Sequence, residues 1–122
     1  MDEAEDKCPA GAVFDRGEAL DRAFGSPELL QELLALFATE GPRLLAELQT
    51  AVAAGRAADA RRLAHTLKGS AGAIAGRAVA NAALGVETAA RDGDLSAAAA
   101  ALPALAQQLD RLLRVLNSGG AI

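Results

Sequence analysis

The sequence predicts an all-α protein, an antiparallel four-helix bundle with a short N-terminal capping helix. Of the 122 residues, 52% are hydrophobic, with alanine and leucine dominant, whereas only 2% are aromatic. Strands favour β-branched and aromatic side chains, so this composition favours helices. Apolar residues also recur at spacings of three and four in four long segments. The connections between these segments are short, as they are in a helical bundle.

The length of the chain fits one compact domain. We expect a mobile acidic tail over residues 1–13, the bundle over residues 14–117 and a flexible C-terminal tail over residues 118–122. The first segment contains Asp2, Glu3, Glu5 and Asp6, followed by Pro9 and Gly11. Such a segment, without periodicity, has too little apolar surface to pack.

A short helix is expected from Phe14 to about Phe24. Its apolar residues, Phe14, Leu20 and Phe24, would pack against the bundle. Ser26 followed by Pro27 then marks a helix start, because the serine hydroxyl caps the backbone and proline at the first position loses no hydrogen bond.

The helix that starts at Pro27 is the longest expected one. Its apolar stripe is formed by Leu30, Leu33, Leu34, Phe37, Leu44, Leu45, Leu48 and Val52. Gly41 and Pro42 interrupt the stripe, so we expect a kink in one helix rather than two helices. Gly55 should end it with a left-handed cap.

The next helix begins near Ala57 or Ala58, with Asp59 in its first turn, where an acidic side chain is favourable. The small residues from Gly72 to Gly76 predict a turn or irregular joint.

A further helix, from about Arg77 to Arg91, has a buried row of Val79, Ala83, Val86 and Ala90. Its alanine content implies close contact between helices. Gly93 and Asp94 separate it from the last helix, for which Asp94 is the expected N-cap. That helix runs from Leu95 to Asn117, with a kink expected at Pro103 and an apolar seam of Leu95, Leu102, Leu105, Leu109, Leu112 and Leu116.

His65 is the only histidine of the chain. At about 100° per residue, one sector of its helix gathers the apolar side chains, namely Ala60, Leu63, Ala64, Leu67, Ala71 and Ile74. His65 falls roughly 160° from the centre of that sector. Its own face, within about 60°, holds Arg61, Arg62, Lys68, Gly69 and Gly72. This face is therefore exposed, basic and poor in side chains.

The two glycines beside His65 are unfavourable for a helix, by roughly 1 kcal/mol each relative to alanine. Close approach of another molecule explains their presence better than helix stability does. We therefore expect Gly69 and Gly72 to belong to a docking surface.

Charge and composition exclude several classes of protein. The net charge of -4 argues against nucleic-acid binding, which needs a basic surface. Cys8 is the only cysteine, so the chain can form no internal disulfide, which suits a reducing compartment. No apolar run reaches membrane-spanning length, and the acidic first residues do not resemble a signal peptide. We expect a cytoplasmic monomer that does not bind membranes.

Most site chemistries are also disfavoured. One histidine and one distant cysteine cannot supply a zinc site, so no metal is expected. A serine or cysteine nucleophile would lack its basic partner, because His65 is flanked by cations. The glycines near His65 lie within a helix and not in a phosphate-binding loop. The imidazole itself remains, and neutral histidine is a competent nucleophile toward phosphorus.

The stretch Arg61-Arg62-Leu63-Ala64-His65-Thr66-Leu67-Lys68-Gly69-Ser70-Ala71 closely resembles the signature of histidine-containing phosphotransfer (HPt) domains, the intermediates of multistep two-component relays. The resemblance covers roughly residues 14–117. It includes Phe14-Asp15, Pro27 to Leu30, Phe37 to Pro42 and Glu87 to Leu95. One departure is Ala75-Gly76, where the family more often has Gly-Ala.

The resemblance implies that His65 accepts a phosphoryl group from a receiver-domain aspartate and passes it to another receiver. Lys68 matches the lysine that helps to hold the phosphoryl oxygens, and Gly69 matches the glycine that leaves room for the receiver. The partners would be receiver domains of response regulators and hybrid histidine kinases. The chain would bring no cofactor, since the magnesium ion belongs to the receiver. It would have no autokinase activity and no nucleotide site.

The remaining candidates have simpler interpretations. Arg61 and Arg62 are more often a solvated cationic face than phosphate ligands, although Arg61 lies one turn from His65 and could tune docking. Ser70 is interpreted as a packing residue, and no chemistry requires Glu87.

Two alternatives stay open. One is a structural bundle whose basic stripe binds an acidic partner helix without chemistry. The other is that this domain is part of a larger hybrid kinase.

Overall fold

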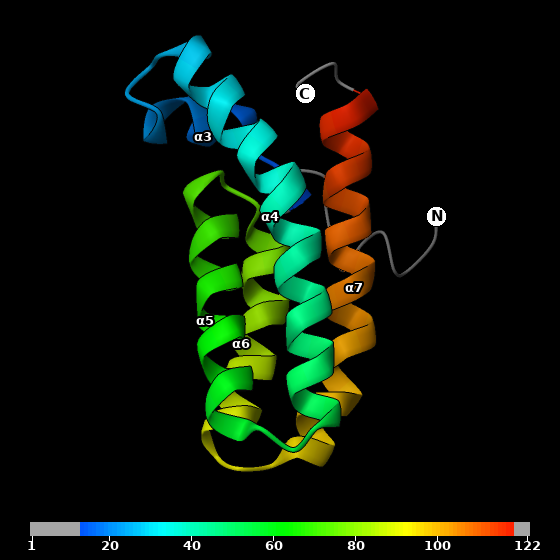
Figure 1. Ribbon diagram of the computed structural model, residues 1–122. Helices are drawn as coiled ribbons and strands as arrows, with labels where there is room; N and C mark the ends of the chain where they lie inside the picture. The colour runs from blue at the N-terminus through cyan, green and yellow to red at the C-terminus, as the bar shows by residue number, and fades with distance from the viewer. Residues whose placement is uncertain (1–12, 119–122) are drawn as a thin grey trace, which may run out of the picture.

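The computed structural model describes residues 13–118, and every regular element in this range is an α-helix. The helices are α3 (Arg16–Arg22), α4 (Pro27–Ala53), α5 (Ala57–Ala73), α6 (Arg77–Arg91) and α7 (Leu95–Ser118). Figure 1 shows α4 to α7 side by side, with successive helices joined at alternate ends. The predicted all-α class and antiparallel four-helix bundle are confirmed.

The short helix α3 lies at the end of the bundle where α5 joins α6 (Figure 1). The backbone N–H of Asp15 donates a hydrogen bond to the carbonyl of Ala75, at 3.4 Å. Arg77 Nη1 lies 2.8 Å from Glu18 Oε1, so an ion pair joins the start of α6 to α3. These contacts hold α3 in the capping position that the sequence predicts.

Phe24 does not pack as predicted. Phe14 and Leu20 contact the core, but Phe24 is 90% exposed. Helix α3 ends at Arg22, and Phe24 has a positive φ of 57° in the turn that follows. It therefore lies beyond the helical stripe that its spacing suggested.

Helix α4 starts and ends as predicted. The hydroxyl of Ser26 accepts a hydrogen bond from the N–H of Leu29, and Gly55 adopts a φ of +76° after the last turn. The helix continues through Pro42 without a break. Figure 1 shows α4 oblique in its first half and upright in its second, in keeping with the expected kink. Gly41 is buried, and a Cβ there would lie only 3.2 Å from side-chain atoms of Phe37 and Leu109.

Helices α6 and α7 have the predicted faces. The buried residues of α6 are Val79, Ala83, Val86 and Ala90. The carboxylate of Asp94 accepts a hydrogen bond from the N–H of Ala97 at 2.9 Å and so caps α7. Pro103 lies inside α7, which is also continuous. In the apolar seam of α7, Leu95 and Leu102 are only partly buried, while Leu105, Leu109, Leu112 and Leu116 are fully buried.

The joint between α5 and α6 is shorter than the predicted segment from Gly72 to Gly76, since α5 extends to Ala73. The left-handed residue is Ala75, with a φ of 59°, and not a glycine. Gly76 packs closely instead, because a Cβ there would lie 2.8 Å from Leu112 Cδ2 and 3.3 Å from the carbonyl oxygen of Ala71, so that Leu112 would have to move. This close packing accounts for a glycine, rather than a larger residue, at position 76.

The core runs the length of the bundle and is apolar, with no buried polar or charged residue in the described range. Val13 belongs to it, with 2% exposure, although the sequence placed it at the end of a tail. The rest of the predicted N-terminal tail, Cys8 included, lies outside the described residues. So do residues 119–122 of the C-terminal tail, whereas Ser118 ends α7.

Candidate functional site

His65 projects from α5 on the side opposite the core, as predicted. The helix buries Ala60, Leu63, Ala64, Leu67 and Ala71 against its neighbours. Because this stripe fixes the rotation of the helix, the imidazole must face outward, and its side chain is 67% exposed. The imidazole is thus open to another molecule.

Glu87, on α6, is the residue that the sequence interpretation missed. Its Oε2 lies 2.9 Å from Nδ1 of His65, and its Oε1 lies 2.8 Å from Nζ of Lys68. The side chain of Glu87 is only 15% exposed, because it lies between the two helices. Val86 and Ala90 anchor α6 in the core, and this places Glu87 beside α5. One carboxylate therefore binds both site residues of the signature.

The contact with Glu87 determines the tautomer of the neutral imidazole. The Lys68 ammonium, followed by the His65 ring, holds the pKa of the Glu87 carboxyl below its ordinary value, although burial opposes this. The carboxylate is therefore ionised near neutral pH and can only accept hydrogen bonds. In neutral His65 the proton must then lie on Nδ1, which donates it to Glu87. Nε2 then carries the lone pair of a side chain that is 67% exposed.

Gly69 and Gly72 leave open space on this face. A Cβ built on either glycine would meet no atom within 4 Å outside its own helix. Neither glycine is therefore needed for packing within the bundle, in contrast to Gly76. Their positions match the bare surface expected beside His65.

A depression of about 280 Å³ adjoins His65 on the N-terminal side. Its lining residues are Ala58, Arg61, Arg62, His65 and Glu87. Arg62 Nη2 lies 3.7 Å from Asp59 Oδ1, whereas Arg61 forms no ion pair or hydrogen bond with a described residue. Both arginines are exposed.

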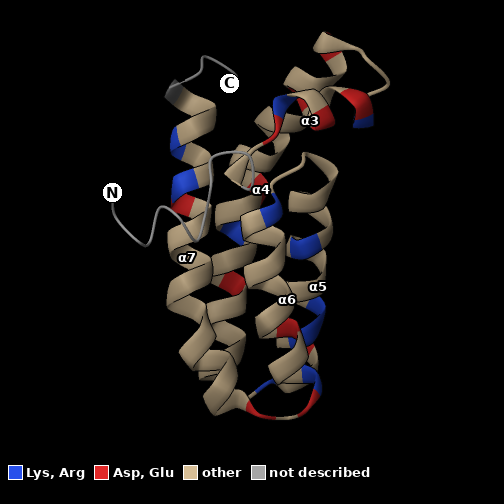
Figure 2. Cartoon of the chain, turned by 180° about the vertical axis from the view of Figure 1, so that it is seen from behind, with Lys and Arg blue, Asp and Glu red and all other residues tan. Residues whose placement is uncertain are grey.

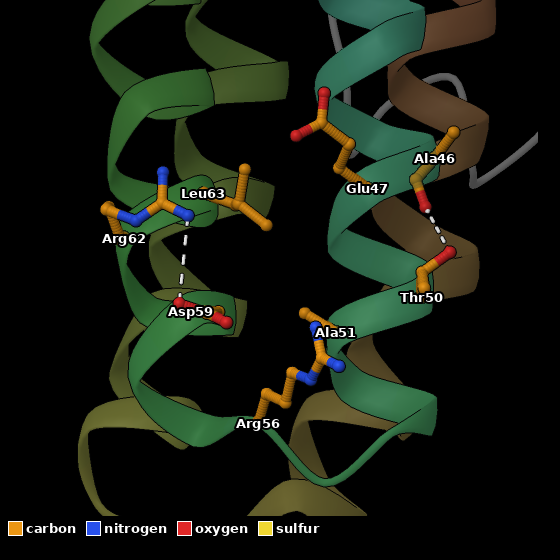
Figure 3. A pocket seen from close by; sticks show the side chains of 8 residues that line it. All are labelled: Ala46, Glu47, Thr50, Ala51, Arg56, Asp59, Arg62 and Leu63. Carbon is orange, nitrogen blue, oxygen red and sulfur yellow. Dashed lines mark hydrogen bonds and ion pairs between the residues drawn. The ribbon is translucent and has the colours of Figure 1, made fainter.

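A second hollow, of about 340 Å³, lies between α4 and α5 (Figure 3). Its charged residues are Glu47, Arg56, Asp59 and Arg62, so its charges are mixed. Figure 3 shows the guanidinium of Arg62 above Asp59 on the same helix. This hollow is less suited to an anion than the depression beside His65.

Figure 2 shows basic positions repeated along α5, whereas most of α6 and α7 beside it is uncharged. Helix α5 carries Arg61, Arg62 and Lys68 but only one acidic residue, Asp59, so the helix that holds His65 has a net positive charge in this acidic protein. Within residues 13–118 no group of three or more His, Cys, Asp or Glu side chains could hold a metal ion. No helix in this range is both long and apolar enough to cross a membrane.

Comparison with known proteins gives one match. The sequence model of the Hpt domain matches residues 32–115, more than half of the chain, and this segment contains His65, Lys68 and Glu87. No curated protein and no solved structure matches the chain. The chain belongs to the Hpt domain family, whose members carry phosphoryl groups on histidine in phosphorelays and are not kinases.

Proposed function

We propose that His65 reversibly accepts a phosphoryl group from the aspartyl phosphate of a receiver domain and passes it to a second receiver domain. The observation that carries this proposal is the exposed imidazole whose Nδ1 lies 2.9 Å from Oε2 of Glu87. A nucleophilic nitrogen must reach phosphorus in a partner protein, so exposure and a fixed ring orientation are the features that the reaction needs.

In the transfer, the Nε2 lone pair attacks phosphorus and forms an N–P bond. The P–O bond to the receiver aspartate breaks, and the aspartate carboxylate leaves with the electron pair. His65 loses no proton, because Nδ1 keeps its hydrogen and continues to donate it to the carboxylate of Glu87. The ring becomes cationic, and the adjacent carboxylate of Glu87 stabilises this charge. The reverse sequence delivers the phosphoryl group to the next receiver.

Lys68 is proposed to stabilise the phosphoryl oxygens. Its side chain is 31% exposed, and its ammonium lies 2.8 Å from Oε1 of Glu87, one turn from His65. An ionised donor to an anionic oxygen is among the stronger hydrogen bonds. The same lysine also holds Glu87 in place beneath the imidazole.

The receiver is proposed to dock over Gly69 and Gly72, with Arg61 and Arg62 at the edge of its footprint. Glycines that meet no neighbouring side chain allow the receiver backbone to approach closely. The chain brings no cofactor, no nucleotide site and no autokinase activity to this reaction, and the magnesium ion belongs to the receiver. We further propose that the protein acts as a cytoplasmic monomer and binds neither membranes nor nucleic acid.

The proposal is tested by timing phosphoryl transfer from a panel of phosphorylated receiver domains of the same organism. One or a few receivers should transfer fast and reversibly to the wild-type protein. If no receiver transfers its phosphoryl group, and the protein instead binds an acidic helical protein stably, a scaffold bundle would be favoured. A receiver with its aspartate replaced by asparagine serves as the control.

A further inference from the structure

The His65 side chain reaches toward the turn that contains Arg61 and Arg62. In an α-helix the Cα–Cβ bonds tilt toward the N-terminus, so a long side chain covers the turn that precedes it. The depression beside His65 agrees with this direction, since Ala58, Arg61 and Arg62 precede His65 and line it. Lys68, in contrast, follows His65 by one turn.

The two nitrogens of the ring face different surroundings. Nδ1 is bound by Glu87 at 2.9 Å, so Nε2 lies on the opposite edge of the ring from this contact. A phosphoryl group on Nε2 is thereby directed away from the carboxylate of Glu87. The depression of about 280 Å³ on the N-terminal side, which His65 and Glu87 line together with Arg61 and Arg62, offers space for it next to the two arginines.

The cations around His65 are not equally available. Lys68 is bound to Glu87 at 2.8 Å, and Arg62 lies near Asp59 (Figure 3). Arg61 lines the depression and is bound to no described residue. Its guanidinium can therefore turn to a new anion without breaking an existing contact.

We propose that Arg61 binds the phosphoryl oxygens on Nε2 of His65 and is, with Lys68, the second cation of the phosphorylated site. This inference rests on the proposed function, because it assumes that His65 is phosphorylated. It gives Arg61 a defined role in place of the solvated surface charge that the sequence favoured.

The charges of the phosphorylated site indicate that a cation besides Lys68 takes part. The phosphoryl oxygens bring about two negative charges and Glu87 brings a third. The phosphorylated ring and Lys68 together supply only two positive charges. Arg61 lines the same depression as His65 and can supply the missing charge, and its planar fork suits binding to two phosphoryl oxygens.

Phosphorylation with phosphoramidate tests this role without a receiver. In this reaction Nε2 attacks phosphorus, the P–N bond of the donor breaks, and ammonia leaves. Arg61→Gln should raise the half-saturating phosphoramidate concentration about 3- to 10-fold, since one charge-assisted contact with the phosphoryl group is lost. Arg62→Gln should have a smaller effect. Arg114→Gln is the matched control, because it removes the same charge from an exposed arginine on α7 that pairs with Asp110.

A second readout observes the contact directly. On phosphorylation of the wild-type protein, the side-chain Nε–Hε signal of Arg61 should shift in a nitrogen–proton correlation spectrum, while that of Arg114 stays in place. Circular dichroism of each variant checks that the bundle is folded. Arg61→Lys should recover part of the lost affinity, since it restores the charge but not the planar fork.

The outcomes separate this inference from the proposed function. If wild type is labelled on His65 but Arg61→Gln behaves like Arg114→Gln and the Arg61 signal does not move, the role of Arg61 is wrong while the function stands. If wild type takes up no phosphate from phosphoramidate or from any receiver, the proposed function fails and the inference fails with it.

Discussion

Glu87 Oε2 lies 2.9 Å from Nδ1 of His65, so a side chain of α6 orients the imidazole on α5. The same carboxylate binds Lys68 through its other oxygen. Three side chains from two helices thus form one unit, in which the nucleophile, its orienting acid and a cation depend on each other. The consequences of this unit can be measured.

Glu87→Gln should slow phosphorylation of His65 by about ten-fold and leave the fold intact. The amide oxygen can still accept the Nδ1–H bond, but it brings no negative charge to stabilise the cationic ring, and Lys68 loses its ion pair. The initial rate of labelling by phosphoramidate measures the effect, with Glu32→Gln, an exposed change on α4, as control. An unchanged rate would mean that Glu87 is a structural ion-pair partner only.

The lowered pKa of Glu87 also predicts a dependence of stability on acid. A carboxyl whose pKa is lower in the folded than in the unfolded protein contributes stability that is present above the unfolded value, near 4.5, and is lost as the pH falls through the folded value. Wild type should therefore lose more stability than Glu87→Gln as the pH falls from about 5 into the strongly acidic range. Urea unfolding at several pH values measures this. Parallel curves for the two proteins would contradict the ionised pair.

Lys68→Ala should leave His65 open to phosphorylation but slow the transfer. The substitution removes one charge-assisted contact of roughly 1.5 to 3 kcal/mol, or about one to two decades in rate if the contact is fully formed in the transition state. Rapid-quench kinetics with a receiver measure the change. A rate equal to that of wild type would reduce Lys68 to a surface charge.

Gly69→Leu should separate stability from function. No atom lies within 4 Å of a Cβ at this position, so the variant should be as stable as wild type or up to about 1 kcal/mol more stable. Labelling by phosphoramidate should stay near normal. Transfer to and from receivers should fall strongly, because the phosphoryl group must come within about 3 to 3.5 Å of the imidazole.

Gly76→Ala is the matched contrast to Gly69→Leu. Its new Cβ would lie 2.8 Å from Leu112 and 3.3 Å from the carbonyl of Ala71. The variant should therefore lose about 1 to 2 kcal/mol of stability but keep its transfer rate. The opposite pattern, with Gly69→Leu unstable and active in transfer, would place the docking surface elsewhere.

The helices, their buried faces and several caps could be predicted from the sequence because they depend on local chemistry. Spacings of three and four give the core row of α6, and Ser26, Gly55 and Asp94 cap helices through their own side chains or backbone freedom. Position on the helix likewise placed His65 on the outer face.

Glu87 could not be found in this way, since its role depends on the register between α5 and α6. The two helices are joined after Ala73 by a turn in which Ala75 has a positive φ of 59°. An alanine does not predict this conformation. The available signal was the resemblance itself, because the segment from Glu87 to Leu95 belongs to it. Phe24 was mispredicted for a related reason, because the turn after α3 breaks the spacing.

The most direct test of this account is phosphoryl transfer from a phosphorylated receiver domain to the wild-type protein and to His65→Gln, followed by intact-mass analysis. His65→Gln should fold normally, since the side chain is 67% exposed. Wild type should gain one phosphoryl group, labile in acid, stable in alkali and located on Nε2 of His65, and His65→Gln should gain none. Phosphorylation of His65→Gln to the wild-type level would contradict the assignment of His65.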